Sequence, residues 1–283
     1  MTELTDFRPS SLAGHWYPGD PQTLAQSVDL YIANAEIPDI PGEILAVVAP
    51  HAGHRYSGPV AGYAFATLRR LTPDLVVIAS PMHQLYLEPV LTSAHEGYRT
   101  PLGDIPINKE VVQEITQAFQ TETGIEISPV RNDNEHSIEI ELPFLQRVFS
   151  HPFQIVPLMI RSQEPQTAQA LGTAIATALK SRSALLLAST DLSHFYPAQV
   201  AETLDKAIIQ AITALNPEGI FLAEKERKGY ACGKGALAAV IWAAKALGAN
   251  KAHHLHYAHS GAVTGDNREV VGYEAAVITR PSP

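Results

Sequence analysis

The sequence predicts an α/β fold in which helices cover both faces of a mostly parallel central sheet. Short runs rich in apolar and β-branched residues predict four strands, at 44–49, 74–80, 153–159 and 184–189. Continuous apolar runs of this length are typical of strands that are buried on both faces. Strand–helix alternation indicates α/β layering, and helix-type patterns follow three of the four runs, at 58–71, 166–181 and 198–215.

The segment "NEHSIEIELPFLQRVF" at 134–149 fits two patterns. Its "SIEIEL" part alternates like a strand, whereas the apolar residues from Ile138 to Phe149 recur at helical spacing. We favour a helix with Asn134 or Ser137 near its N-cap.

The C-terminal part of the chain predicts two paired strands. The segments 253–261 and 269–279 are joined by a turn-rich stretch at 262–268. No stretch resembles an interdomain linker, so we expect residues 1–283 to form a single domain.

Composition excludes several functional classes. The 283 residues are 46% hydrophobic and carry a net charge of −9, without a Lys/Arg stripe, which excludes a nucleic-acid phosphate binder. No apolar run reaches the roughly 18 residues of a membrane span, and the N-terminus lacks the apolar region of a signal peptide. The chain has 1 cysteine, which rules out an intramolecular disulfide, so we expect a cytoplasmic protein.

Chemically useful side chains follow three predicted strands. His51 and His83 come after the first two strands, and Asp191 with His194 comes after the strand at 184–189. Cys232 opens an apolar helix. In open α/β sheets, ligands bind outside the carboxyl ends of the strands, so these groups are candidates for one shared metal or catalytic site.

Each group also has a structural interpretation. A histidine after a strand often serves as a loop hydrogen-bonder, a cysteine at a helix start is often core filling, and Asp191 could cap the following helix. The histidines at 253–259 fit a half-exposed strand better than a ligand set.

Eight motifs occur in one order along nearly the whole chain, and together they resemble the Memo-like family (AmmeMemoRadiSam system protein B), which is related in fold to the class III extradiol dioxygenases. They are "AGHWYPGD" (13–20), "APHAGHRYSG" (49–58), "SPMHQ" (80–84), "TPLGDIPIN" (100–108), "NEHSIEIELPFLQ" (134–146), "STDLSHF" (189–195), "ACGKGA" (231–236) and "GDNREVVGYEAAVI" (265–278). The resemblance implies the same α/β fold for this chain.

The resemblance also implies a metal pocket. By motif, the expected metal ligands are His51, His83 and Cys232. His194 is the expected acid/base, and Asp191 is expected to orient it. The expected pocket residues are Trp16, His54, Glu135 and His136. Two departures from the family pattern are Met82 with Gln84 around His83, and His54 where the family usually has a tyrosine; His54 could add a ligand or a proton donor.

Two histidines and a carboxylate form the usual open face of non-haem iron(II), and a thiolate here replaces the carboxylate. Because thiolate is softer, the set suits copper as well as iron(II) and makes the site sensitive to oxidation. The resemblance therefore implies a dioxygenase-like, metal-dependent redox enzyme with a small organic substrate. The alternatives are a non-catalytic adaptor that binds a peptide in the same pocket, or an accessory component that works with AMMECR1-like and radical-SAM proteins.

Overall fold

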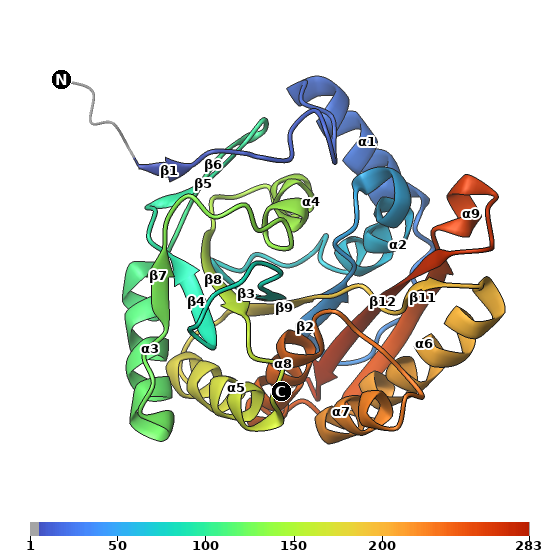
Figure 1. The fold of residues 1–283 in the computed structure, drawn as a ribbon. Coiled ribbons are helices and arrows are strands. Elements are labelled where there is room, and N and C mark those ends of the chain that lie inside the picture. The colour runs from blue at the N-terminus through green and yellow to red at the C-terminus, as the bar shows by residue number, and fades with distance from the viewer. Residues whose placement is uncertain (1–5, 283) are drawn as a thin grey trace.

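The computed structural model describes residues 6–282 and shows an α/β fold built on a nine-stranded mixed sheet (Figure 1). The four predicted strands are confirmed and lie side by side in the order β2, β9, β3, β8, each parallel to its neighbour. Their bounds are Glu43–Ala49 for β2, Leu75–Pro81 for β3, Gln154–Ile160 for β8 and Leu185–Ser189 for β9.

Shorter or antiparallel strands complete both sides of this parallel centre. They are β4 (Val90–Ser93), β7 (Ser128–Val130), β10 (His194–Tyr196), β11 (Lys251–His259) and β12 (Val270–Arg280). The predicted pairing of the two C-terminal strands is confirmed, since β11 and β12 are antiparallel. A separate three-stranded sheet consists of β1 (Phe7–Arg8), β5 (Gly97–Thr100) and β6 (Gly103–Pro106).

Helices cover both faces of the main sheet, as predicted (Figure 1). On one face lie α1 (Pro21–Asn34), α2 (His54–Ala66) and α4 (Leu142–Val148). The other face is covered by α3 (Lys109–Thr123), α5 (Pro165–Leu179), α6 (Ala198–Thr213) and α8 (Lys234–Ala246). Two further helices are α7 (Pro217–Lys225) and α9 (Gly261–Thr264).

The apolar strands owe their continuous pattern to this double cover. In β2, Ala46 and Val48 belong to the core on the α5 and α8 face, while Val47 and Ala49 belong to the core on the α1 and α2 face. Since successive side chains of a strand point to opposite faces, a strand between two helical layers needs apolar residues at every position. In the described part of the chain, no helix is both long and apolar enough to cross a membrane.

The helix predicted for 134–149 begins later than expected. A 3₁₀ turn covers Glu139–Glu141, and α4 starts only at Leu142. Neither Asn134 nor Ser137 caps it. Residues before the turn are held in an irregular loop, where the Glu135 side chain accepts hydrogen bonds from the backbone N–H groups of His136 and Ser137. These side-chain contacts compete with a helical backbone and delay its start.

Candidate metal centre

The parallel strands bring three sequence-distant segments to one edge of the sheet. β2 and β9 pair with Ala49 opposite Ser189, and β3 pairs with β9 along the same direction. His51, His83 and Asp191 each follow one of these strands by two residues. The predicted crevice at the carboxyl ends of the strands therefore forms.

Three histidines meet at this edge. His51, His83 and His136 each offer a ring nitrogen, and these atoms all lie within 4.8 Å of one another. The ring centroids are 5.4 Å apart for His51 and His83, 5.3 Å for His51 and His136, and 4.6 Å for His83 and His136. His136 comes from the loop that follows β7, and the sequence analysis placed it in the pocket without giving it a ligand role.

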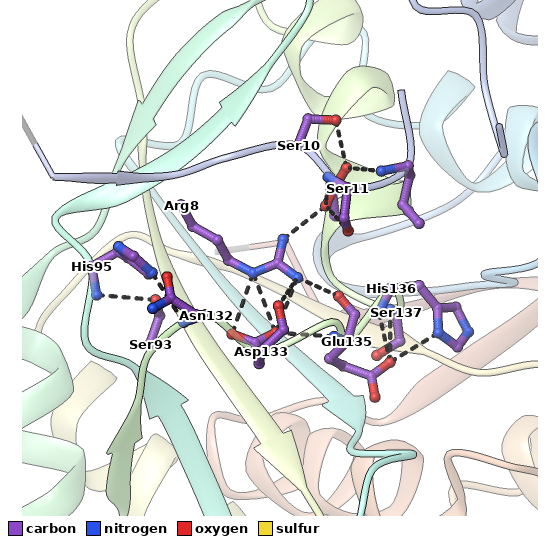
Figure 2. Close-up of polar contacts among 12 residues, drawn as sticks. Arg8, Ser10, Ser11, Ser93, His95, Asn132, Asp133, Glu135, His136 and Ser137 are labelled. Atoms are coloured by element: carbon purple, nitrogen blue, oxygen red, sulfur yellow. Dashed lines mark hydrogen bonds and ion pairs between the residues drawn. The ribbon is translucent and has the colours of Figure 1, made fainter. Parts of the chain in front are cut away.

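One carboxylate holds two of these rings. Oε1 of Glu135 lies 2.9 Å from Nδ1 of His83 and 3.2 Å from Nδ1 of His136 (Figure 2 shows Glu135 beside His136). The other carboxylate oxygen accepts the backbone N–H of His83 at 2.6 Å. The hydrogen bond at Nδ1 of His83 leaves its Nε2 for an ion, which is the usual arrangement of metal-binding histidines.

His51 is oriented through the last residue of β9. Its Nδ1 lies 2.9 Å from the hydroxyl oxygen of Ser189, which also lies 2.7 Å from Oε1 of Glu141 and 2.8 Å from the carbonyl oxygen of Ser137. A hydroxyl has a single proton. The Glu141 and Ser137 oxygens are both nearer to the Ser189 hydroxyl than Nδ1 of His51 is, so Ser189 donates to one of these oxygens. His51 then donates from Nδ1 to Ser189, and its Nε2 carries the free lone pair.

Cys232 lies beside this nitrogen. Its sulfur is 3.1 Å from Nε2 of His51 and accepts the backbone N–H of Asp191 at 3.2 Å. Two ligands held about 2.1 and 2.3 Å from one ion lie about 3 to 3.6 Å apart, so this pair is spaced for joint coordination. Cys232 is nevertheless outside the group of three histidines. Burial, helped by the charge of Asp191, raises the pKa of the Cys232 thiol.

The site is electrostatically prepared for a cation. Burial lowers the pKa of His51 well below its usual value and that of His136 to about 4, so both rings are neutral near pH 7. Burial alone would raise the pKa of Glu135, but the His83 hydrogen bond and the neighbouring His136 outweigh it, and the net pKa is lowered. Neutral imidazoles beside a buried carboxylate fit a divalent metal, because ligands must be deprotonated before they bind.

Asp191 and His194 both line the cleft, but they do not form the expected pair. Oδ1 of Asp191 accepts the backbone N–H of His51 at 2.8 Å, and burial raises the pKa of this carboxyl to about 7. Nδ1 of His194 lies 2.8 Å from the carbonyl oxygen of Leu192. The expectation that Asp191 orients His194 is therefore wrong for the described residues. Asp191 holds the segment that carries His51, and the Leu192 carbonyl orients His194.

The three histidines open into a cleft of about 870 Å³, whose walls include Trp16, Asp191 and His194. The Trp16 ring packs against His136 with centroids 4.6 Å apart. His54 is not among the lining residues. As the first residue of α2 it is buried, with its Nε2 2.8 Å from the carbonyl oxygen of Ile140. The expected pocket position of His54 is thus corrected, because its ring faces the core beside α4.

Four supporting residues escaped the sequence analysis: Arg8, Glu139, Glu141 and Ser189. Glu139 and Glu141 are fully buried, although their alternation with isoleucines had the appearance of a strand with one solvated face. Only Ser189 carried a sequence signal, as a polar residue that ends an apolar strand run next to Asp191.

Fold and site together define an α/β protein with a histidine-rich candidate metal centre at the carboxyl edge of its sheet. Residues 8–277 match the family described as "Memo-like protein". The chain belongs to this family. It is 36% identical over 273 residues to a "MEMO1 family protein" of Nitrosopumilus maritimus, covering 95% of this chain and 98% of that one. It is 37% identical over 284 residues to one of Methanopyrus kandleri, covering 96% and 99%.

A solved structure shares the fold. The crystal structure of an uncharacterized protein from Escherichia coli K12 superposes with a TM-score of 0.53 and covers 82% of this chain and 99% of its own. Its sequence identity to this chain is 14%, so the similarity supports a shared architecture and nothing beyond it.

Proposed function

We propose that this protein is a metal-dependent redox enzyme that acts on a small organic substrate in the cleft, with iron(II) or copper as its metal. The observation that carries the proposal is the orientation of the three histidines. Hydrogen bonds at Nδ1 fix the rings of His51 and His83, the Glu135 carboxylate lies 3.2 Å from Nδ1 of His136, and one nitrogen of each ring lies within 4.8 Å of the other two at the wall of an open cleft.

Both the family resemblance and the spacing of the ring nitrogens favour His51 and His83 as ligands. The family resemblance favours Cys232 as the third, and the spacing of the ring nitrogens favours His136. A set of three imidazoles suits iron, copper or zinc, whereas a thiolate shifts the preference towards softer ions such as copper(I). The third ligand therefore decides the metal.

When bound, iron or copper would supply one-electron chemistry and a positive charge that attracts an oxygen donor of the substrate. The protein's own residues would do the rest. Glu135 and Ser189 keep the imidazoles of His83 and His51 in one tautomer. His194, whose Nδ1 is taken by a carbonyl, can exchange a proton with a cleft ligand through Nε2.

The test is anaerobic purification followed by elemental analysis, with oxygen uptake measured on candidate catechols. We expect about one iron or copper per chain, and loss of the metal in His51→Ala. Comparison of Cys232→Ala with His136→Ala identifies the third ligand as the residue whose removal lowers the metal content more. A metal-free protein that takes up neither ion on titration would contradict the proposal.

A second candidate, a peptide-binding adaptor that uses the same cleft, is favoured by the exposed aromatic residues that line it. Trp16, Tyr56 and Phe195 are 40%, 39% and 69% exposed. Exposed aromatic side chains are common in recognition surfaces. An adaptor would bind its peptide equally well after removal of the metal, whereas an enzyme would lose turnover. A role alongside AMMECR1-like and radical-SAM proteins fits either candidate, and co-purification from cells would test it.

A further inference from the structure

We propose that Arg8, which is 127 positions from Glu135 in the chain, is the positioning residue of the metal centre. It holds the loop at 131–138, which carries His136, so that Glu135 can orient His83. This inference rests on the proposed metal-binding function, and its experiment has one readout that does not need the metal.

Arg8 is buried, with 1% of its surface exposed, and its guanidinium binds three residues of the stretch 133–139; Figure 2 labels two of them, Asp133 and Glu135. Nη2 donates to the backbone carbonyl of Glu135 at 2.7 Å and to Oδ1 of Asp133 at 3.0 Å. Nη1 donates to Oε2 of Glu139 at 2.7 Å. The planar guanidinium fork makes these contacts simultaneously, which a lysine ammonium cannot reproduce.

The loop needs such a support because no helix or strand fixes it. Residues 131–138 run between β7 and the 3₁₀ turn without a ladder of backbone hydrogen bonds. Asp133, paired with Arg8, accepts the backbone N–H of Glu135 at 3.1 Å. Arg8 therefore acts on Glu135 from both sides: it binds the carbonyl directly and the amide through Asp133.

Any displacement of Glu135 affects both imidazoles. Its carboxylate accepts a hydrogen bond from Nδ1 of His83, which leaves Nε2 of that ring free, and it lies 3.2 Å from Nδ1 of His136. A shift of the loop by about 1 Å would break hydrogen bonds of this length. Loss of an outer contact of this kind typically lowers metal affinity about 10- to 100-fold.

The simpler alternative is that Arg8 only neutralises buried carboxylates. Glu139 separates the two interpretations, because it shares the Arg8 ion pair but has no hydrogen bond to Glu135 among the described residues. Its other contacts go to the N-terminal segment, where Ser10 and Tyr17 donate to Oε1 at 2.7 and 2.8 Å. Glu139→Gln is thus a matched control: it disturbs the same ion cluster and leaves the Arg8 contact to Glu135 intact.

The experiment titrates cobalt(II), followed by its visible absorption, into the wild type, Arg8→Lys and Glu139→Gln, each checked for cooperative thermal unfolding. We expect cobalt affinity to fall at least tenfold in Arg8→Lys, with altered absorption bands, and to change less than threefold in Glu139→Gln. Equal losses in both variants, or unchanged affinity in Arg8→Lys, would overturn the inference. If Arg8→Lys does not fold, the double variant Arg8→Gln with Glu139→Gln replaces it, since one cation and one anion are removed together.

A double-mutant cycle of Arg8→Lys with Glu135→Gln tests whether Arg8 acts on the metal centre through Glu135. If Arg8 acts through Glu135, Arg8→Lys has no further effect on cobalt affinity in the Glu135→Gln background; additive losses would contradict this. In the metal-free wild type, nitrogen-15 spectra of the imidazoles should show the proton of His83 on Nδ1, and Arg8→Lys should lose this preference. An unchanged tautomer would refute the role of Arg8. A wild type that binds no cobalt but shows the expected tautomers would instead refute the metal function and leave the positioning role standing.

Discussion

The sulfur of Cys232 lies 3.1 Å from Nε2 of His51, although 181 positions separate the two residues in the chain. The contact joins the end of β2 to the start of α8, and the backbone of Asp191 lies against the same sulfur. Two different roles produce such a contact. The sulfur is a metal ligand next to a second ligand, or it is a buried thiol in a hydrogen bond with a histidine.

Alkylation of Cys232 distinguishes these roles. We expect saturating iron(II) or copper(I) to slow labelling by iodoacetamide at least tenfold, because a bound cation withdraws charge from the sulfur and blocks its approach to the reagent. Mass spectrometry measures the rate on the chain's single cysteine. His51→Ala is the control, in which the metal should no longer protect. Equal rates with and without metal in the wild type would place Cys232 outside the ligand set.

Ser189→Ala should weaken metal binding about tenfold or more, since His51 loses the hydroxyl that receives its Nδ1 proton and fixes its tautomer. Metal titration monitored by Trp16 fluorescence measures this, because the Trp16 ring lies 4.6 Å from His136. Ser193→Ala is the matched control: Ser193 is also buried, but its hydroxyl has no partner among the described residues. The idea fails if both serine variants bind metal alike.

The neutral, buried state of His54 should make the protein less stable in mild acid. Burial lowers the pKa of His54 to about 4 from its ordinary value of 6.5. The unfolded chain therefore binds a proton between these two values when the folded chain does not, and stability falls as the pH drops through this range. For this one group the loss is about 2 kcal/mol between pH 7 and pH 5.

His54→Gln should remove that dependence and keep a hydrogen-bond donor for the Ile140 carbonyl. The measurement is the free energy of unfolding in urea for both proteins at pH 7 and pH 5. Other histidines titrate in both proteins alike, so the difference between the two losses isolates His54. Identical losses would show that His54 accepts a proton without cost in the folded state.

Gly272→Ala should destabilise the protein by about 3 kcal/mol or more, because overpacking of a rigid interior is costly. An added Cβ would lie 1.8 Å from Oδ2 of Asp205, a buried carboxylate. The same carboxylate accepts the backbone N–H of Ser193 at 2.8 Å and the hydroxyl of Tyr257 at 2.7 Å, so it has little freedom to move. Urea unfolding measures the effect.

The double variant Gly272→Ala with Asp205→Ala checks the cause. If the clash is responsible, the double variant loses less stability than the sum of the two single variants. Strict additivity would mean that the strand, and not Asp205, rejects the methyl group.

The pattern of apolar residues along the chain was enough to predict the strands at the centre of the sheet. The strands at 44–49 and 184–189 were correctly predicted because burial between two helical layers demands apolar residues at every position. The pattern failed at 134–149, where helical spacing was real but the helix starts only at Leu142. There the side chains of Asp133 and Glu135 bind backbone N–H groups, and such competition is invisible in the periodicity of apolar residues.

The sequence by itself determined the α/β class, the carboxyl edge at which a site forms, and the presence there of His51, His83 and Asp191, because parallel strands deliver their ends to one edge. Tertiary structure alone decided which neighbours complete the site. It brought His136 up to the other two rings and turned His54 into the core. It also gave Glu135 a buried support in Arg8. These contacts join residues more than 50 positions apart, so three-dimensional packing and not local spacing selects them.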